Sequence, residues 1–326
     1  MQIYANFINP ANFKSLCILK KNAIFFYNHL IFCNLIATNQ QLKIMKKILF
    51  PTDFSETANN AFVYALKLAK SIDAEIYVLN TYEMPVISTT SAGQPELIQN
   101  VYNSIELNNF DNYKKQVPKL RSIATDVDCS DIKLTFIFEE GIMLSILHKI
   151  IRDENIDFIV MGTNGNSGFE KKLLGSNTVH VMENVDIPIL SVPRKAEFKR
   201  LNNFGFATML RDSDKAGLHQ IIKIAKSLNA DVKVLHVLRK ENPDAMNVLN
   251  SWKEEFNNEN VTFHTVLNEK LDESVFFFID DQLIDVMCIV KRHLNFFEKI
   301  FITSLSKQLS YHADVPVLVL KEQKSK

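Results

Sequence analysis

Short apolar runs alternate with amphipathic segments along the chain from Met45 onward. Residues 48–53 form an apolar run stopped by Pro51 and Asp53, which is typical of a buried strand that leads into a loop. Ser55 or Thr57 can then cap a helix, because apolar residues recur at helical spacing after them. Strands that alternate with helices in this way form parallel βαβ units. The same pattern predicts further strands at 76–79, 133–138, 158–161 and 187–192, and further helices at 95–121, 141–152 and 176–183.

The chain from Met45 contains one such unit twice. Residues 67–79 (KLAKSIDAEIYVL) match residues 223–235 (KIAKSLNADVKVL), and residues 157–188 match residues 285–316, each without a gap. Between these two matches the second copy is shorter, mostly in the polar stretch after its second strand. Each copy is too long for a solenoid repeat and carries a full set of strands. The expected domains are residues 45–195 and residues 201–321.

The first 44 residues differ in composition from the rest of the chain. They contain four lysines and no acidic residue, and their apolar run at 23–37 is interrupted by Asn28, His29 and Asn34. This run is shorter than the ~20 residues that a membrane helix needs, and no small-residue cleavage site of a signal peptide follows it. We expect residues 1–44 to be a misassigned upstream start, with a membrane-associating leader or a disordered arm as alternatives.

The charge and cysteine content narrow the class of partner. Lys and Arg together equal Asp and Glu at 37 each, so no global field attracts nucleic acid or anionic lipid. An anionic ligand therefore needs a local site. Cys17, Cys33, Cys129 and Cys288 lie far apart without a C-x-x-C pair, which argues against a zinc site and a disulfide framework. We expect no metal site, and the cysteines favour a reducing cytoplasm.

A glycine pattern follows the fourth predicted strand of the first copy. Gly162 and Gly165 are followed by nine residues and then by Gly175 and Ser176 at the start of a helix. A phosphate that approaches backbone N–H groups needs residues without Cβ, and a helix start supplies free N–H donors. Asp53 ends the first strand beside the same crevice. The alternative is that these glycines only form turns. The sequence contains no P-loop, dinucleotide fingerprint or nucleophile elbow.

With these residues the sequence resembles the universal stress protein family. Residues 46–55 (KKILFPTDFS) are similar to its opening strand, and the glycine spacing is that of its ATP-binding motif, G-2x-G-9x-G-[S/T]. The resemblance covers residues 45–320. It implies an α/β fold with two tandem copies of a five-stranded parallel, doubly wound sheet of the adenine nucleotide alpha hydrolase type, with helices on both faces. It also implies pairing through the fifth strands, here residues 187–192 and 315–320.

The resemblance further implies a set of binding residues in the first copy. Thr52 and Asp53 would line the adenine and ribose end of the pocket, and the backbone around Leu79 and Asn80 would face the base. The phosphates and ribose would be surrounded by Gly162, Gly165, Gly175 and Ser176. One position departs from the family pattern, because Asn164 stands where a basic residue is frequent. Lys171 and Lys172 are either its substitutes or solvated loop residues.

The second copy lacks most of this motif. Side chains occupy the places where a phosphate would touch backbone, so we expect this domain not to bind nucleotide in the same manner. The replacements are Val290 for Gly162, His293 for Gly165, Thr303 for Gly175 and Met209 for Asp53, with Ser304 retained at the place of Ser176.

These observations lead to one functional hypothesis and two alternatives. The hypothesis is a cytoplasmic ATP-binding regulatory protein of the stress response, with or without Mg²⁺, that acts on an unidentified protein partner and has no catalytic residue. The first alternative is a slow ATPase in which Glu139 or Glu140 orients a water molecule. The second is a structural protein that binds no nucleotide. We expect the two copies to form an intramolecular pseudo-dimer, and a homodimer of the whole chain is left as an alternative. We expect no binding to nucleic acid or membranes.

Overall fold

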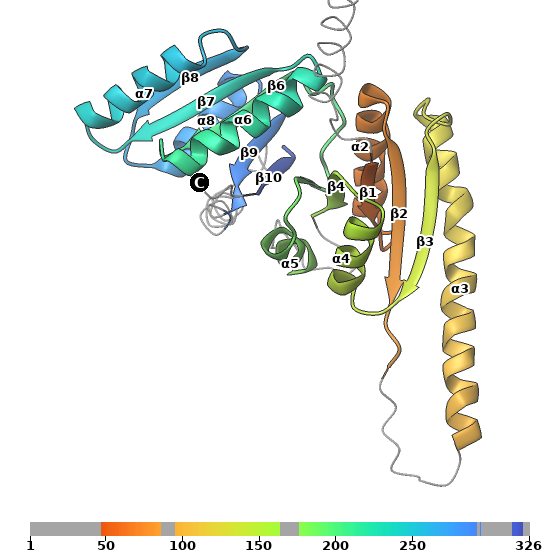
Figure 1. Ribbon diagram of the computed structural model, residues 1–326. Coiled ribbons are helices and arrows are strands. Elements are labelled where there is room, and N and C mark those ends of the chain that lie inside the picture. Colours follow the sequence, from red (N-terminus) through yellow and green to blue (C-terminus); the bar gives the residue numbers. More distant parts are fainter. Residues whose placement is uncertain (1–46, 86–94, 164–175, 292–293, 295–314, 322–326) are drawn as a thin grey trace, which may run out of the picture. The chain divides into compact units, whose positions relative to one another are not determined.

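The computed structural model describes residues 47–85, 95–163, 176–291, 294 and 315–321, and Figure 1 shows the course of these elements. The first copy alternates strands and helices as its pattern predicts. Its elements are β1 (Lys47–Pro51), α2 (Glu56–Ile72), β2 (Glu75–Tyr82), α3 (Pro95–Asp126), β3 (Leu134–Glu140), α4 (Met143–Asp153), β4 (Phe158–Gly162), α5 (Ser176–Asn184) and β5 (Ile189–Val192). Those of the second copy are β6 (Asn203–Thr208), α6 (Asp212–Ser227), β7 (Asp231–Leu238), α7 (Pro243–Glu255), β8 (Val261–Leu267), α8 (Leu271–Asp281), β9 (Val286–Val290) and β10 (Val317–Leu320).

The strands of the described residues form one ten-stranded sheet in the order β3-β2-β1-β4-β5-β10-β9-β6-β7-β8. Neighbouring strands are parallel except for β5 and β10, which are antiparallel. Read outward from β5 and from β10, the two halves of the sheet have the same strand order. The expected α/β class with a mostly parallel sheet is confirmed.

Helices cover the sheet on both faces. Ile48 and Phe50 of β1 lie in one hydrophobic core with side chains of α2, α3, α6 and α7. Leu49, which lies between them, belongs to a second core with side chains of α4, α5 and α8. Successive side chains of a strand point to opposite faces, and all three of these are fully buried. Burial on both sides explains why the strands read as continuous apolar runs.

The two halves of the sheet meet at β5 and β10. Leu190 pairs with Leu318 at the centre of this antiparallel contact, and both side chains are buried. Asp186, just before β5, forms ion pairs with Lys291 at 3.4 Å and with Lys321 at 3.5 Å. The last strands of the two copies therefore pair, as the sequence led us to expect.

Some elements extend beyond their predicted bounds. Helix α3 continues to Asp126 although the pattern predicts its end at residue 121, and it does so with Pro118 in its interior. Ala124 is buried in the core, so packing extends the helix past the expected end. The counterpart of α3 in the second copy, α7, has 13 residues against 32. This difference accounts for most of the shortening of the second copy.

Several sequence predictions fall on residues that the structure does not describe. They are the segment 1–44 and the positions Asn164, Gly165, Lys171, Lys172, Gly175, His293, Thr303 and Ser304. Among the described helices, none has the length and apolar character needed to cross a bilayer. Cys129 and Cys288 are both buried free thiols.

Candidate functional site

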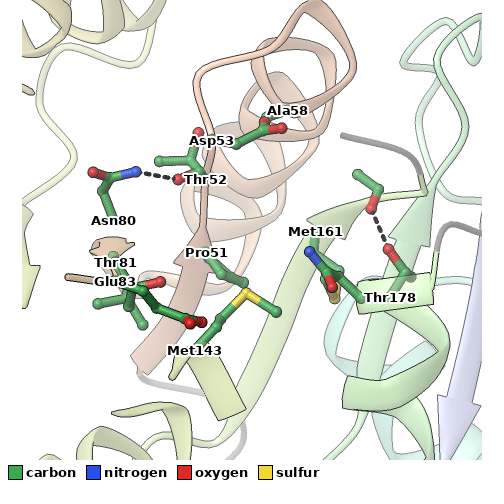
Figure 2. A pocket seen from close by; sticks show the side chains of 13 residues that line it. Pro51, Thr52, Asp53, Ala58, Asn80, Thr81, Glu83, Met143, Met161 and Thr178 are labelled. Carbon is green, nitrogen blue, oxygen red and sulfur yellow. Dashed lines mark hydrogen bonds between the residues drawn. The ribbon is translucent and has the colours of Figure 1, made fainter. Parts of the chain in front are cut away.

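A pocket of about 410 Å³ opens where β1, β2 and β4 reach their carboxyl ends. This is the edge at which open parallel sheets bind their ligands. Five of the residues predicted to bind the nucleotide line it together, namely Thr52, Asp53, Leu79, Asn80 and Gly162. Figure 2 shows how the side chains of Thr52, Asp53 and Asn80 lie. The other lining residues are Pro51, Ala58, Thr81, Glu83, Met143, Met161, Asn177 and Thr178.

The loop between β1 and α2 forms one wall and is held by its own side chains. The Thr52 hydroxyl accepts a hydrogen bond from Phe54 N at 2.9 Å, and Asp53 Oδ1 accepts one from Ser55 N at 3.0 Å. Phe54 has a left-handed backbone with φ of 61°. Ser55 caps α2, because its hydroxyl accepts from Ala58 N at 3.2 Å, so Ser55 rather than Thr57 is the helix cap.

The end of β2 is fixed to this loop by two hydrogen bonds. Asn80 Nδ2 donates to the carbonyl of Thr52 at 2.8 Å, as Figure 2 shows, and Thr52 N donates to the carbonyl of Leu79 at 2.8 Å. The Leu79 side chain is buried, so Leu79 presents its backbone rather than its side chain to the loop. These two hydrogen bonds fix the positions of Thr52 and Asn80 relative to each other.

Gly162 forms the wall on the side of β4, and the structure gives it a packing role. A Cβ at this position would lie 2.9 Å from Thr57 Cγ2 and 3.1 Å from the Thr57 carbonyl oxygen. Helix α2 thus packs against β4 too closely for a side chain at residue 162. The Thr178 hydroxyl lies 3.0 Å from the Gly162 carbonyl and 2.9 Å from that of Thr163, and this side chain ties the start of α5 to the end of β4.

Ser176, the last of the predicted binding residues, begins α5 and is exposed. It does not line the pocket, whereas its neighbours Asn177 and Thr178 do. Sequence reasoning missed these two because the motif marks only the start of the helix. It also missed Met143, which reaches the pocket from α4 on another part of the chain.

An aromatic cluster supports the loop on the side of α3. The Phe54 ring lies 6.1 Å from that of Tyr113, and the Tyr113 ring stacks on Phe138 at 4.7 Å. Tyr82, at the end of β2, stacks on the same Phe138 at 4.7 Å. Burial raises the pKa of the Tyr113 hydroxyl. These contacts hold the left-handed Phe54 in place.

Among the residues that the structure describes, the charged side chains that line the pocket are Asp53 and Glu83, which are both acidic. Glu139, a candidate for orienting a water molecule, forms an ion pair with Lys149 at 3.5 Å instead. Neither Glu139 nor Glu140 lines the pocket. The described residues contain no group of three or more side chains that could hold a metal ion.

The equivalent region of the second copy is packed differently. Val290 replaces Gly162, and its side chain extends toward Gly217 of α6, where a Cβ would lie 2.7 Å from Val290 Cγ2. Gly217 in turn stands where α2 has Ala61. His236 replaces Asn80 and keeps its hydrogen bond, with Nδ1 at 3.0 Å from the Thr208 carbonyl. The second copy therefore has valine on the strand where the first has Gly162, and glycine on the helix where the first has Ala61.

Comparisons with known proteins match this architecture. A family model described as the universal stress protein family matches residues 45–193. Universal stress protein MJ0577 of Methanocaldococcus jannaschii is 31% identical over 159 aligned positions, and the match covers 46% of this chain and 96% of that protein. Universal stress protein MJ0531 of the same organism is 28% identical over 152 residues, 46% of this chain and 84% of that protein. The crystal structure of a universal stress protein from Archaeoglobus fulgidus covers 86% of this chain and 99% of its own, with a TM-score of 0.61 and 20% identity, so the similarity of fold extends over both copies.

Proposed function

Because the chain belongs to the universal stress protein family, we propose that its first copy, residues 45–195, binds ATP at the pocket beside β1 and β4. The observation that carries this proposal is the convergence of Thr52, Asp53 and Asn80 with Leu79 and Gly162 around one cavity. Its volume of about 410 Å³ is in the range of small-molecule sites, roughly 300–1,000 Å³.

The chemistry of the lining suits a nucleoside. Met143, Met161 and Pro51 provide apolar surface for a flat base. The Asp53 carboxylate, exposed at the pocket wall, can accept hydrogen bonds from ribose hydroxyls. The phosphates would extend from Gly162 toward Gly165, Gly175 and Ser176, where backbone N–H groups and the start of α5 favour negative charge.

We assign the second copy, residues 201–321, to a regulatory rather than a binding role. Val290 and Met209 replace Gly162 and Asp53, so both a carboxylate for the ribose and the bare backbone are missing. Nucleotide occupancy of the first copy would then bias an interaction surface for a protein partner in the cytoplasm. This role accords with the family's part in the stress response that the sequence resemblance implies.

Binding is favoured over hydrolysis by the position of the carboxylates. Glu139 is paired with Lys149 and lies away from the pocket lining, so it is poorly placed to orient a water molecule. A Mg²⁺ ion that accompanies ATP would be held mainly by the phosphates, since the described residues offer no cluster of ligands for it.

Calorimetric titration of the full chain with ATP tests the proposal. We expect about one site per chain and a large loss of affinity in Asp53→Ala. The matched control is Met209→Ala, which alters the equivalent position of the second copy and should leave binding unchanged. Absence of binding, together with absence of nucleotide in the natively purified protein, would support the nucleotide-free structural role instead.

A further inference from the structure

The loops between the first strand and the first helix have the same geometry in the two copies. Thr52 and Thr208 occupy equivalent positions, and their hydroxyls accept from Phe54 N at 2.9 Å and from Leu210 N at 2.8 Å. Phe54 and Leu210 both have left-handed backbones, with φ of 61° and 58°. A difference in the chemistry of these loops therefore cannot be attributed to a different backbone.

The copies differ at the third residue of the helix that follows. In the first copy it is Ala58, which lines the pocket. In the second it is Asp214, which is fully buried. Asp214 Oδ2 accepts hydrogen bonds from the Thr208 hydroxyl at 3.1 Å, from Met209 N at 2.9 Å and from Arg211 N at 3.4 Å. One carboxylate oxygen thus accepts from three donors of this loop.

In the first copy, the described residues offer the equivalent Thr52 hydroxyl no such acceptor. Thr52 is 8% exposed and lines the pocket. Among the described residues, the hydrogen bond of its hydroxyl is the one that it accepts from Phe54 N, so its proton is left for another acceptor. Ala58 leaves the space in front of it open. A buried hydroxyl that faces a cavity in this way favours a ligand atom that accepts a hydrogen bond.

We infer that the Asp214 carboxylate is a built-in occupant of the second copy, which supplies there the acceptor atom that a bound ligand supplies to Thr52 in the first. The part of this inference that concerns Thr52 and a nucleoside rests on the proposed function, whereas the part that concerns Asp214 does not. It assigns Thr52 Oγ1 as a hydrogen-bond donor to the nucleoside, to a ring nitrogen or a sugar oxygen, and it makes residue 58 the position that decides whether the site is open.

Placing an aspartate in the first copy tests the inference directly. Ala58→Asp should lower ATP affinity by more than about tenfold, because the carboxylate takes the donor from the ligand. It should also slow amide hydrogen exchange in residues 52–55, as the loop gains an internal acceptor. Ala58→Leu, which has the branching of aspartate without its oxygens, should lower affinity but leave the exchange rate unchanged. Unchanged ATP affinity or unchanged exchange in Ala58→Asp would overturn the inference.

Removing the aspartate from the second copy gives a test that needs no nucleotide. In Asp214→Ala, the backbone amides of Met209 and Arg211 should exchange hydrogen faster than in the native chain. Formate or acetate should restore their protection with a saturable dependence on concentration, whereas chloride at equal ionic strength should not. Asp214→Asn keeps an acceptor oxygen and should stay close to the native exchange rate, even if the alanine variant fails to fold. Equal effects of formate and chloride would count against the inference. If formate restores protection but the chain binds no ATP, the role of Asp214 stands and only the proposed function is refuted.

Discussion

The first and second copies differ in where a glycine allows the first helix to pack closely against a strand of the sheet. In the first, α2 approaches β4 so closely that Gly162 cannot carry a Cβ, and Ala61 fits on the helix. In the second, the strand carries Val290 and the helix carries Gly217. The close approaches lie at different helix positions, because Gly162 faces Thr57 whereas Val290 faces Gly217, whose equivalent in α2 is Ala61, one turn after Thr57. A glycine that a binding motif requires can therefore be given up once the facing helix supplies another.

The largest expected effect tests whether the copies unfold separately. Phe50 and Phe206 occupy equivalent positions and are both fully buried. Phe50→Ala and Phe206→Ala should each lower the free energy of unfolding by about 3–5 kcal/mol, since each leaves a cavity in a core. The single Trp, Trp252, is buried in the second copy, so denaturation followed by its fluorescence reports that copy. If the copies are independent, only Phe206→Ala shifts this transition, and a shift in both variants would show one cooperative unit.

ATP should stabilise the chain through the site in the first copy alone. ATP at about 100 times its dissociation constant should stabilise a one-site chain by roughly 2.7 kcal/mol. Thermal unfolding with increasing ATP measures this, and Asp53→Ala is the variant in which the shift should disappear. Two equivalent sites in a titration would contradict the claim that the second copy has lost its site.

The exchanged glycine gives a smaller effect of about 1–3 kcal/mol. Gly217→Ala should destabilise the chain, because the new Cβ would lie 2.7 Å from Val290 Cγ2 in a packed core. Adding Val290→Gly should remove most of this cost, since the clash partner is gone. Chemical denaturation of the two single variants and the double variant measures the coupling energy. Additive effects would mean that the two residues do not compensate each other.

The smallest effect concerns the ion pairs where the copies meet. Asp186→Asn should cost less than about 1 kcal/mol, because Asp186 is 65% exposed and its pairs with Lys291 and Lys321 are screened by solvent. Desolvation raises the pKa of Asp186, and the charges of Lys321 and Lys291 outweigh it, so the pKa lies below its ordinary value of 3.8.

This shift fixes the sign of the pH dependence. A carboxyl whose pKa is lower in the folded state stabilises the fold at pH values above its unfolded pKa and loses that contribution as the pH falls through the folded pKa. The difference in unfolding free energy between the native chain and Asp186→Asn should therefore be present at neutral pH and vanish in acid. A difference that persists unchanged below pH 3.8 would show that the ion pairs are not its source.

The sequence predicted the parts of the site that belong to a local pattern. Asp53 follows an apolar run that stops abruptly, and Gly162 ends another, so strand ends and the sheet edge place them together, whereas Thr52, Leu79 and Asn80 were implied by the family resemblance. Met143 could not be found in this way, because only the packing of α4 brings it to the pocket. The sequence also explained only in part why residue 162 is glycine. Its close contact with Thr57 depends on how near α2 lies to β4, which the sequence pattern does not show.

Asp214 illustrates a second limit. An acidic residue in the first turn of a helix usually indicates an exposed side chain that interacts with the helix dipole. The bond from Arg211 N is that of a capping box, which spacing can indicate, but the burial of Asp214 and its bonds from the Thr208 hydroxyl and Met209 N depend on the loop geometry. Comparing the copies position by position drew attention to Met209, but Ala58 gave no reason to inspect its partner.

The antiparallel contact of β5 with β10 has a consequence for communication between the copies. Because it reverses the strand direction, the carboxyl ends of the strands in one copy lie at the opposite edge of the sheet from those of the other. A ligand beside β1 and β4 is thus remote from the loop that Asp214 holds. The copies are connected by the pairing of β5 with β10 and by the hydrophobic core that α2, α3, α6 and α7 share. A coupling between the two sites therefore depends on these shared contacts and not on direct proximity.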